Sequence, residues 1–130
     1  MSVVVGYLGS KEGQAALRAA VQECLLRGSD LVVVRTPRSG ESADDPAVSA
    51  ELSSARKELE AAGLALALRR GTEGQEAAEN LIDAATAVDG EVIVIGLRRR
   101  STLGKLILGS NAQRVLLDAP CPVLAVKADG

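Results

Sequence analysis

Short apolar runs alternate along this chain with longer segments in which apolar residues recur every three or four positions. The runs predict five strands, at residues 3–6, 31–34, 64–68, 92–95 and 123–126. Most of these runs are continuously apolar, as in strands buried on both faces of a parallel sheet, whereas residues 64–68 alternate Leu and Ala and suit an edge. Four segments with helical spacing lie between the strands. This alternation predicts an α/β fold with a parallel sheet and right-handed crossovers.

Residues that start and stop helices mark the boundaries of the four helical segments. The first helix is expected at residues 11–27, before Gly28, and the second follows a surface loop at residues 37–45 and stops at Gly63. Residues 72–75 fit a capping box that opens the third helix, which stops near Gly90. The last helix is expected at residues 109–118. Its inward residues are predicted to be Ala112, Val115 and Leu116.

The composition argues against several classes of function. The 130 residues match one ordinary domain, and a net charge of −2 argues against nucleic acid as a partner. No apolar run approaches the ~20 residues that a membrane helix needs, so we expect a cytoplasmic protein. The chain has no histidine, which removes the commonest general base and metal ligand. Cys24 and Cys121 have no metal-ligand spacing and are expected to be core residues.

The segment between Val92 and Leu117 is cationic and contains no Asp or Glu. It holds Arg98, Arg99, Arg100, Lys105 and Arg114 among the 15 Lys and Arg of the chain. A run of arginines is often only a solvated surface. Here it lies between a strand end and a glycine-containing loop before a helix, where free backbone N–H groups and the helix dipole favour anions. The pattern therefore predicts a phosphate site.

The ends of the first and fourth strands are the natural walls of a ligand crevice. In open parallel sheets ligands bind beyond the carboxyl ends of the strands, at the point where strand order reverses. Residues 6–10 and 96–109 follow those two strands. We expect these segments to flank the site.

The same residues resemble the universal stress protein family over essentially the whole chain. The resemblance rests on VVVG-x-x-GS near the start and on GLRRRSTLGKLILGSNAQRVLLDAPCPVLAV at the end. It implies a single domain over residues 1–130. It also implies a five-stranded sheet of order 3-2-1-4-5 with helices on both faces, a Rossmann-like fold of the adenine nucleotide alpha hydrolase type.

ATP-binding members of that family carry a motif of the form G-x2-G-x9-G-[S/T]. The resemblance implies binding of ATP, accompanied by Mg²⁺, in a regulatory protein of the stress response. Phosphates would rest on backbone amides after the fourth strand, and the nucleoside would contact the ends of the first two strands. The implied site consists of Tyr7, Leu8, Gly9, Thr36, Gly96, Arg98, Arg99, Gly109, Ser110, Asn111 and Ala112.

Two positions depart from the family pattern and leave two functions open. The middle glycine of the motif is Arg99, whose side chain either contacts phosphate or fills the phosphate site. Leu8 stands where many ATP-binding members have an Asp, and leucine cannot accept a hydrogen bond from a nucleoside. One hypothesis is an ATP-binding regulator; the other is a nucleotide-free dimeric interaction module with Arg99 in the phosphate site.

The sequence favours a binding protein over an enzyme. Hydrolysis of ATP needs a group that positions or deprotonates water, and neither a histidine nor an obvious pair of carboxylates is present. We expect weak or no ATPase activity. The resemblance further implies a homodimer formed through the last strand, from Pro122 to Lys127. That strand would otherwise be an exposed apolar sheet edge.

Overall fold

A computed structural model describes residues 1–6, 11–36, 46–98 and 109–128. The predicted surface loop at residues 37–45 lies outside these residues. Strands and helices alternate strictly. The strands are β1 (Ser2–Gly6), β2 (Asp30–Arg35), β3 (Leu66–Arg70), β4 (Val92–Arg98) and β5 (Val123–Ala128), and the helices are α1 (Lys11–Arg27), α2 (Pro46–Ala61), α3 (Ala77–Ala87) and α4 (Ser110–Asp118).

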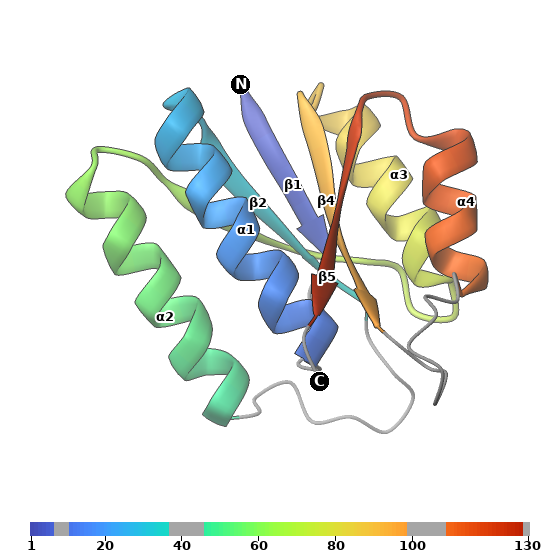
Figure 1. Ribbon diagram of the computed structural model, residues 1–130, viewed down its shortest axis with the longest axis horizontal. Coiled ribbons are helices and arrows are strands. Elements are labelled where there is room, and N and C mark those ends of the chain that lie inside the picture. The colour runs from blue at the N-terminus through green and yellow to red at the C-terminus, as the bar shows by residue number, and fades with distance from the viewer. Residues whose placement is uncertain (7–10, 37–45, 99–108, 129–130) are drawn as a thin grey trace.

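The five strands form one parallel sheet of order β3-β2-β1-β4-β5 (Figure 1). The predicted fold class and strand order are therefore confirmed. β1 lies at the centre, with Val4 beside Val32 of β2 on one side and Ile93 of β4 on the other. β3 and β5 are the edges, as predicted for the Leu/Ala-alternating strand.

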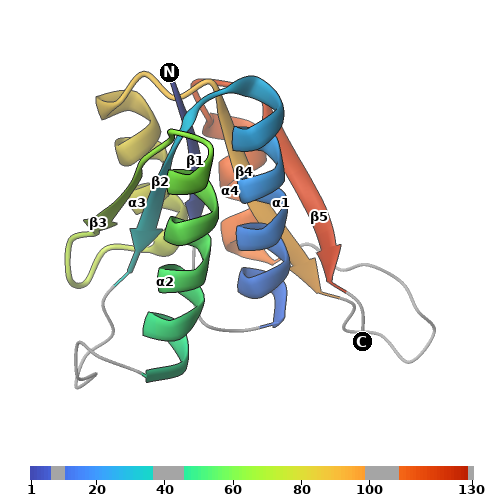
Figure 2. The same cartoon turned by 90° about the vertical axis from the view of Figure 1, so that its left-hand side faces the viewer.

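Helices cover both faces of the sheet, which is why the central strands are continuously apolar. Val3 and Val5 pack with α1 and α2 on one face, whereas Val4 packs with α3 and α4 on the other. Figure 2 shows α1 and α2 side by side on their face of the sheet. Because successive side chains of a strand point to opposite faces, a single run of three valines serves both cores.

Helix α1 spans the predicted residues, and its inward face includes Cys24. The Cys24 side chain is fully buried. Burial raises the pKa of its thiol to about 12, and the carboxylates of Glu91, Asp30 and Glu23 add to the shift. The thiol therefore stays protonated at neutral pH. This position confirms the prediction of a core cysteine.

The third strand begins two residues later than predicted, at Leu66. Gly63 adopts a positive φ of 76° after α2, and Leu64 N–H donates back to Leu59 O at 2.9 Å. Residue 64 is thus still part of the C-terminal cap of α2. Ala65 N–H then donates to Asp30 Oδ1 at 2.9 Å, and regular pairing starts only afterwards. The apolar pattern alone did not reveal this cap.

The predicted capping box at residues 72–75 is wrong. Gln75 N–H donates to Thr72 O at 3.2 Å, so these residues form a turn that precedes the helix. Helix α3 begins at Ala77 after Glu76, whose side chain makes no capping hydrogen bond. The pattern was ambiguous because Thr and Gly are common both in turns and at helix N-termini.

The inward face of α4 is narrower than predicted. Val115 is buried and Ala112 packs against the same core. Leu116 was expected to point inward but is 44% exposed. α4 packs mainly beside α3, and only one stripe of this short helix reaches the core.

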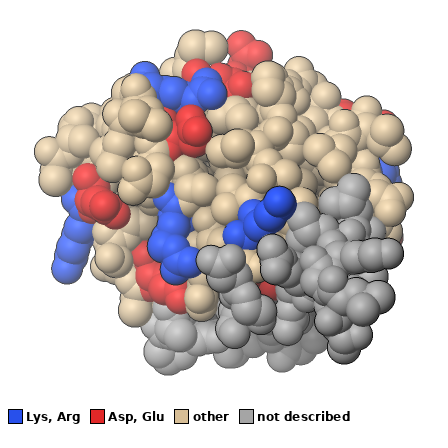
Figure 3. All heavy atoms as spheres, viewed as in Figure 1, with Lys and Arg blue, Asp and Glu red and all other residues tan. Residues whose placement is uncertain are grey.

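Among the described residues, no helix is long and apolar enough to cross a membrane. On the face seen in Figure 3, cationic and anionic side chains lie interspersed. This mixture agrees with the small net charge of the sequence.

Candidate functional site

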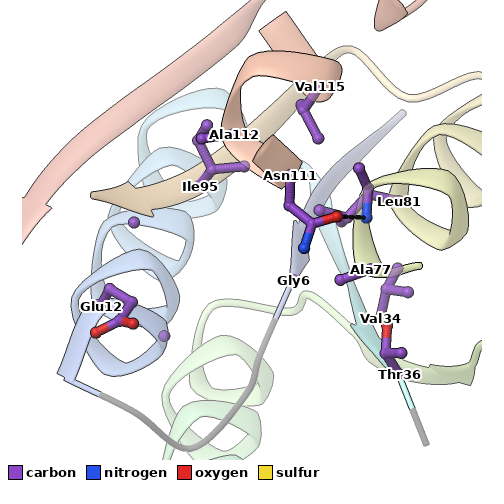
Figure 4. A pocket seen from close by; sticks show the side chains of 13 residues that line it. Gly6, Glu12, Val34, Thr36, Ala77, Leu81, Ile95, Asn111, Ala112 and Val115 are labelled. Atoms are coloured by element: carbon purple, nitrogen blue, oxygen red, sulfur yellow. Dashed lines mark hydrogen bonds between the residues drawn. The ribbon is translucent and has the colours of Figure 1, made fainter. Parts of the chain in front are cut away.

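A cavity of about 110 Å³ lies where β1, β2 and β4 end. β1 is flanked there by β2 and β4, so the cavity sits at the point where strand order reverses. Helices α1, α3 and α4 begin at the same place (Figure 4). The lining residues are Gly6, Glu12, Gly13, Val34, Thr36, Ala77, Ala78, Leu81, Ile95, Gly96, Asn111, Ala112 and Val115.

Gly96 allows β4 to approach the first turn of α1 closely. A Cβ atom added at this position would overlap the backbone carbonyl oxygen of Glu12. A Cβ on Gly6 would lie 3.0 Å from Leu81 Cδ1, a tight contact with a flexible side chain. The two strand-end glycines therefore shape the cavity by close packing.

The N-terminus of α4 opens beside the cavity and offers free backbone donors. The first helical bond runs from Gln113 N–H to Gly109 O at 3.0 Å. The N–H groups of Ser110, Asn111 and Ala112 accordingly have no acceptor within the helix. The first turn contains no acidic residue, and Gly109 has no side chain to cap it. Such an end suits an anion.

Asn111 joins the first turns of α3 and α4. Its Oδ1 accepts a hydrogen bond from Ala78 N–H at 3.1 Å, marked by the dashed line in Figure 4. Ala78 is the second residue of α3, so Asn111 caps a neighbouring helix. With Oδ1 engaged, its Nδ2 group is directed toward the cavity as a donor.

Comparison with known proteins identifies the family of this chain. A sequence model of the Universal stress protein family matches residues 1–127. The chain belongs to the universal stress protein family. A universal stress protein of Mycolicibacterium smegmatis is 38% identical over 129 residues, with 98% of both chains covered.

Solved structures of universal stress proteins show the same fold. A universal stress protein from Archaeoglobus fulgidus has a TM-score of 0.74 and 34% identity, and 98% of each chain is covered. The structure of the Archaeoglobus fulgidus universal stress protein in complex with dAMP has a TM-score of 0.69 and 29% identity, again with 98% of each chain covered. A member of the family thus binds an adenine nucleotide.

Several residues predicted for the site of this universal stress protein do meet at the cavity. Thr36, Gly96, Asn111 and Ala112 line it. Gly109 and Ser110 immediately precede the last two in α4. Arg98 ends β4, two residues beyond Gly96. Tyr7, Leu8, Gly9 and Arg99 lie outside the described residues.

Helix α4 begins at Ser110, one residue after the predicted start at Gly109. Gly109 is itself the N-cap of α4, with an extended backbone at φ −69° and ψ 166°, and Ser110 is the first helical residue. The backbone at Gly109 is open to any residue type. No described atom lies within 4 Å of an added Cβ. The fold itself therefore does not require glycine there.

Asn80 is a site residue that the sequence analysis missed. It is 4% exposed and connects three segments. Its Nδ2 donates to Thr36 Oγ1 at 3.1 Å, and its Oδ1 accepts from Thr72 N–H at 3.1 Å. Because Thr36 Oγ1 accepts this bond, its own hydrogen can be donated to a ligand. Asn80 precedes buried Ala84 by four residues, so its place on the apolar face was a usable signal.

The structure places two charged residues at the site differently from the sequence prediction of a purely cationic segment. Arg114, one of the five cations of the segment, is paired with Glu79 at 3.6 Å and Asp118 at 3.3 Å. Glu12, far away in sequence, brings a carboxylate to the cavity wall. The apolar spacing of α1 did not assign Glu12 to either face of the helix. Its position beside β4 follows only from the way α1 packs on the sheet. Within the described part of the chain, no group of three His, Cys, Asp or Glu could hold a metal ion.

Proposed function

We propose that this universal stress protein binds adenine nucleotide, with ATP the first candidate, at the cavity between α1, α3 and α4. It would act in the cytoplasm as a regulator of the stress response. The observation that carries the proposal is the uncapped first turn of α4, with no acidic residue, opening beside a cavity at the strand-order reversal. A relative with the same fold in complex with dAMP supports it.

One set of described residues suits the phosphate of a nucleotide, and another set suits its nucleoside. A phosphate would rest on the N–H groups of Ser110, Asn111 and Ala112, where the helix dipole favours negative charge. The missing side chain of Gly109 leaves space for it. A cavity of about 110 Å³ accommodates one ring-sized group beside Thr36, and the rest of the nucleotide would extend from its mouth.

Mg²⁺ would accompany the phosphates of ATP and neutralise part of their charge. Mg²⁺ in such sites is commonly held by phosphate oxygens and water with few protein ligands. We infer binding without efficient turnover. Hydrolysis requires a group that positions water, and the sequence offers no histidine for that role.

A titration of ¹⁵N-labelled, nucleotide-stripped protein with ATP and Mg²⁺ tests the proposal. We expect saturable shifts of the amide signals of Ser110, Asn111 and Ala112, because these groups would donate to phosphate. AMP should shift the signals of residues lining the cavity. Unchanged spectra at millimolar ATP would instead favour the nucleotide-free interaction module, with Arg99 in the phosphate site.

We also propose that the protein forms a homodimer through β5. Ile93 N–H donates to Pro122 O at 3.0 Å, so Pro122 and Leu124 direct their backbone groups toward β4. Backbone groups alternate along a strand, and those of Val123 and Ala125 therefore face away from the sheet. An outward row of donors and acceptors on an edge strand is a template for pairing with a second chain.

Replacing Ala125 with proline is expected to convert a dimer into a folded monomer. The change removes an outward N–H group and leaves the ladder to β4 intact, which edge strands tolerate. Ala125→Val keeps the N–H group and should remain dimeric. Sedimentation velocity and circular dichroism measure both variants. A dimeric Ala125→Pro protein, or a monomeric wild type, would contradict pairing through β5.

A further inference from the structure

The carboxylate of Glu12 is the most unexpected group in the cavity. Glu12 lies in the first turn of α1, across the cavity from Asn111 (Figure 4). Its Oε2 atom is shielded from solvent and, within the described part of the chain, has no hydrogen-bond partner. The position is fixed on the backbone side as well, because the Glu12 carbonyl packs against Gly96.

An ionised oxygen that loses water without gaining a donor is unfavourable. The dipole of α1 favours a negative charge in its first turn and offsets part of this effect. The dipole supplies no hydrogen bond to Oε2, however. A carboxylate has only acceptors, so a hydrogen-bonding partner for Oε2 must bring an N–H or O–H group. In the residue ranges that the structure describes, no group of three His, Cys, Asp or Glu would hold a metal ion there instead.

The other polar groups of the cavity wall can act as hydrogen-bond donors, in contrast to the Glu12 carboxylate. The Nδ2 group of Asn111 is directed inward as a donor because Oδ1 is held by Ala78 N–H. Thr36 can donate its hydroxyl hydrogen because its oxygen accepts from Asn80. A ligand between these walls would therefore present acceptors to Asn111 and Thr36 and a donor to Glu12. Phosphate, which presents acceptors and negative charge, is disfavoured beside Glu12 and favoured at α4.

We propose that Glu12 is a specificity-determining residue that accepts a hydrogen bond from the nucleoside part of the ligand. The inference rests on the proposed binding of adenine nucleotide at this cavity. The donor is either a ribose hydroxyl or the exocyclic amine of the base, which share the chemistry that the carboxylate recognises. Glu12 thereby sets the orientation of the nucleotide, with the nucleoside toward α1 and the phosphate at α4.

Binding of three nucleotides by calorimetry tests this role. AMP carries both kinds of donor, 2′,3′-dideoxy-AMP lacks the ribose hydroxyls, and IMP lacks the amine. Wild type is expected to bind AMP about tenfold more tightly than the analogue without the donor that Glu12 contacts. This ratio should fall to about twofold or less in Glu12→Gln and Glu12→Ala. Because every ligand carries one phosphate, the ratio cancels the effect of charge removal on phosphate.

Glu76→Gln is the matched control. Glu76 is the exposed N-cap of α3 and does not line the cavity, so the change removes the same charge nearby. In Glu76→Gln the ratio of AMP affinity to analogue affinity should equal that of wild type. A fall in this ratio as large as that in Glu12→Gln would overturn a direct contact between Glu12 and the nucleoside. Variants of Glu12 that keep the wild-type ratio, with or without a lower Tm, would overturn the role of Glu12 and leave nucleotide binding standing. A wild type that binds none of the three would instead refute the proposed function, and this inference with it.

Discussion

Replacing Gly96 with alanine is expected to lower the free energy of unfolding by about 3 kcal/mol. The added Cβ would overlap the backbone carbonyl oxygen of Glu12, and a backbone atom cannot rotate away as a side chain can. Relief requires β4 or the first turn of α1 to shift. Either shift also deforms the cavity wall, so nucleotide affinity should fall together with stability. Urea denaturation measures the first effect.

Gly109→Ala is the control because it makes the same substitution at the other described glycine of the motif. No described atom would contact its Cβ, and its φ of −69° suits alanine. We expect a loss of about 1 kcal/mol or less, from the poorer N-cap. Equal stability of Gly96→Ala and wild type would show that the approach of β4 to α1 is looser than the structure indicates.

This contrast separates two reasons for glycine within a single motif. At Gly96 the protein's own packing excludes a side chain. At Gly109 neither backbone conformation nor described neighbours require glycine, which is the pattern expected where a ligand approaches the chain. The motif therefore combines an architectural position with a candidate ligand position.

The second large effect is expected from filling the cavity. Ala77 is the first residue of α3 and lines the cavity. Leucine at this position would occupy much of a space of about 110 Å³ that the nucleoside needs. We expect the Kd for ATP, measured by calorimetry, to rise about 100-fold or more, equivalent to roughly 2.8 kcal/mol. Stability should change little, because leucine is a good helix former.

Ala87→Leu makes the same change at the exposed end of the same helix and should bind ATP like wild type. This pair separates blocking of the cavity from any general effect of leucine on α3. Equal Kd values for the two variants would place the ligand elsewhere.

The fold could be predicted well from the sequence because buried strands impose a simple pattern. Runs such as residues 31–34 have no polar position, and only a sheet covered on both faces explains them. Errors arose at boundaries, where local signals are ambiguous. Leu64 is apolar and yet belongs to a helix cap, and the polar turn at residues 72–75 imitates a capping box.

The site could be predicted only where its residues follow strand ends or precede helices. Gly96, Asn111 and Ala112 carried such signals in one continuous segment. Glu12 and Asn80 did not, because their relation to the cavity arises from packing between elements far apart in sequence. Asn111 shows a further limit: its backbone was predicted to hold phosphate, whereas the cap that its side chain provides for α3 depends on how α3 and α4 lie together.

The most direct measurement of the central claim is a calorimetric titration of nucleotide-stripped wild-type protein with ATP in the presence of Mg²⁺. We predict a saturable heat that fits one site per chain and that is lost when the cavity is filled in Ala77→Leu. The absence of binding heat in wild type, or the same heat and affinity in Ala77→Leu, would contradict nucleotide binding at this cavity.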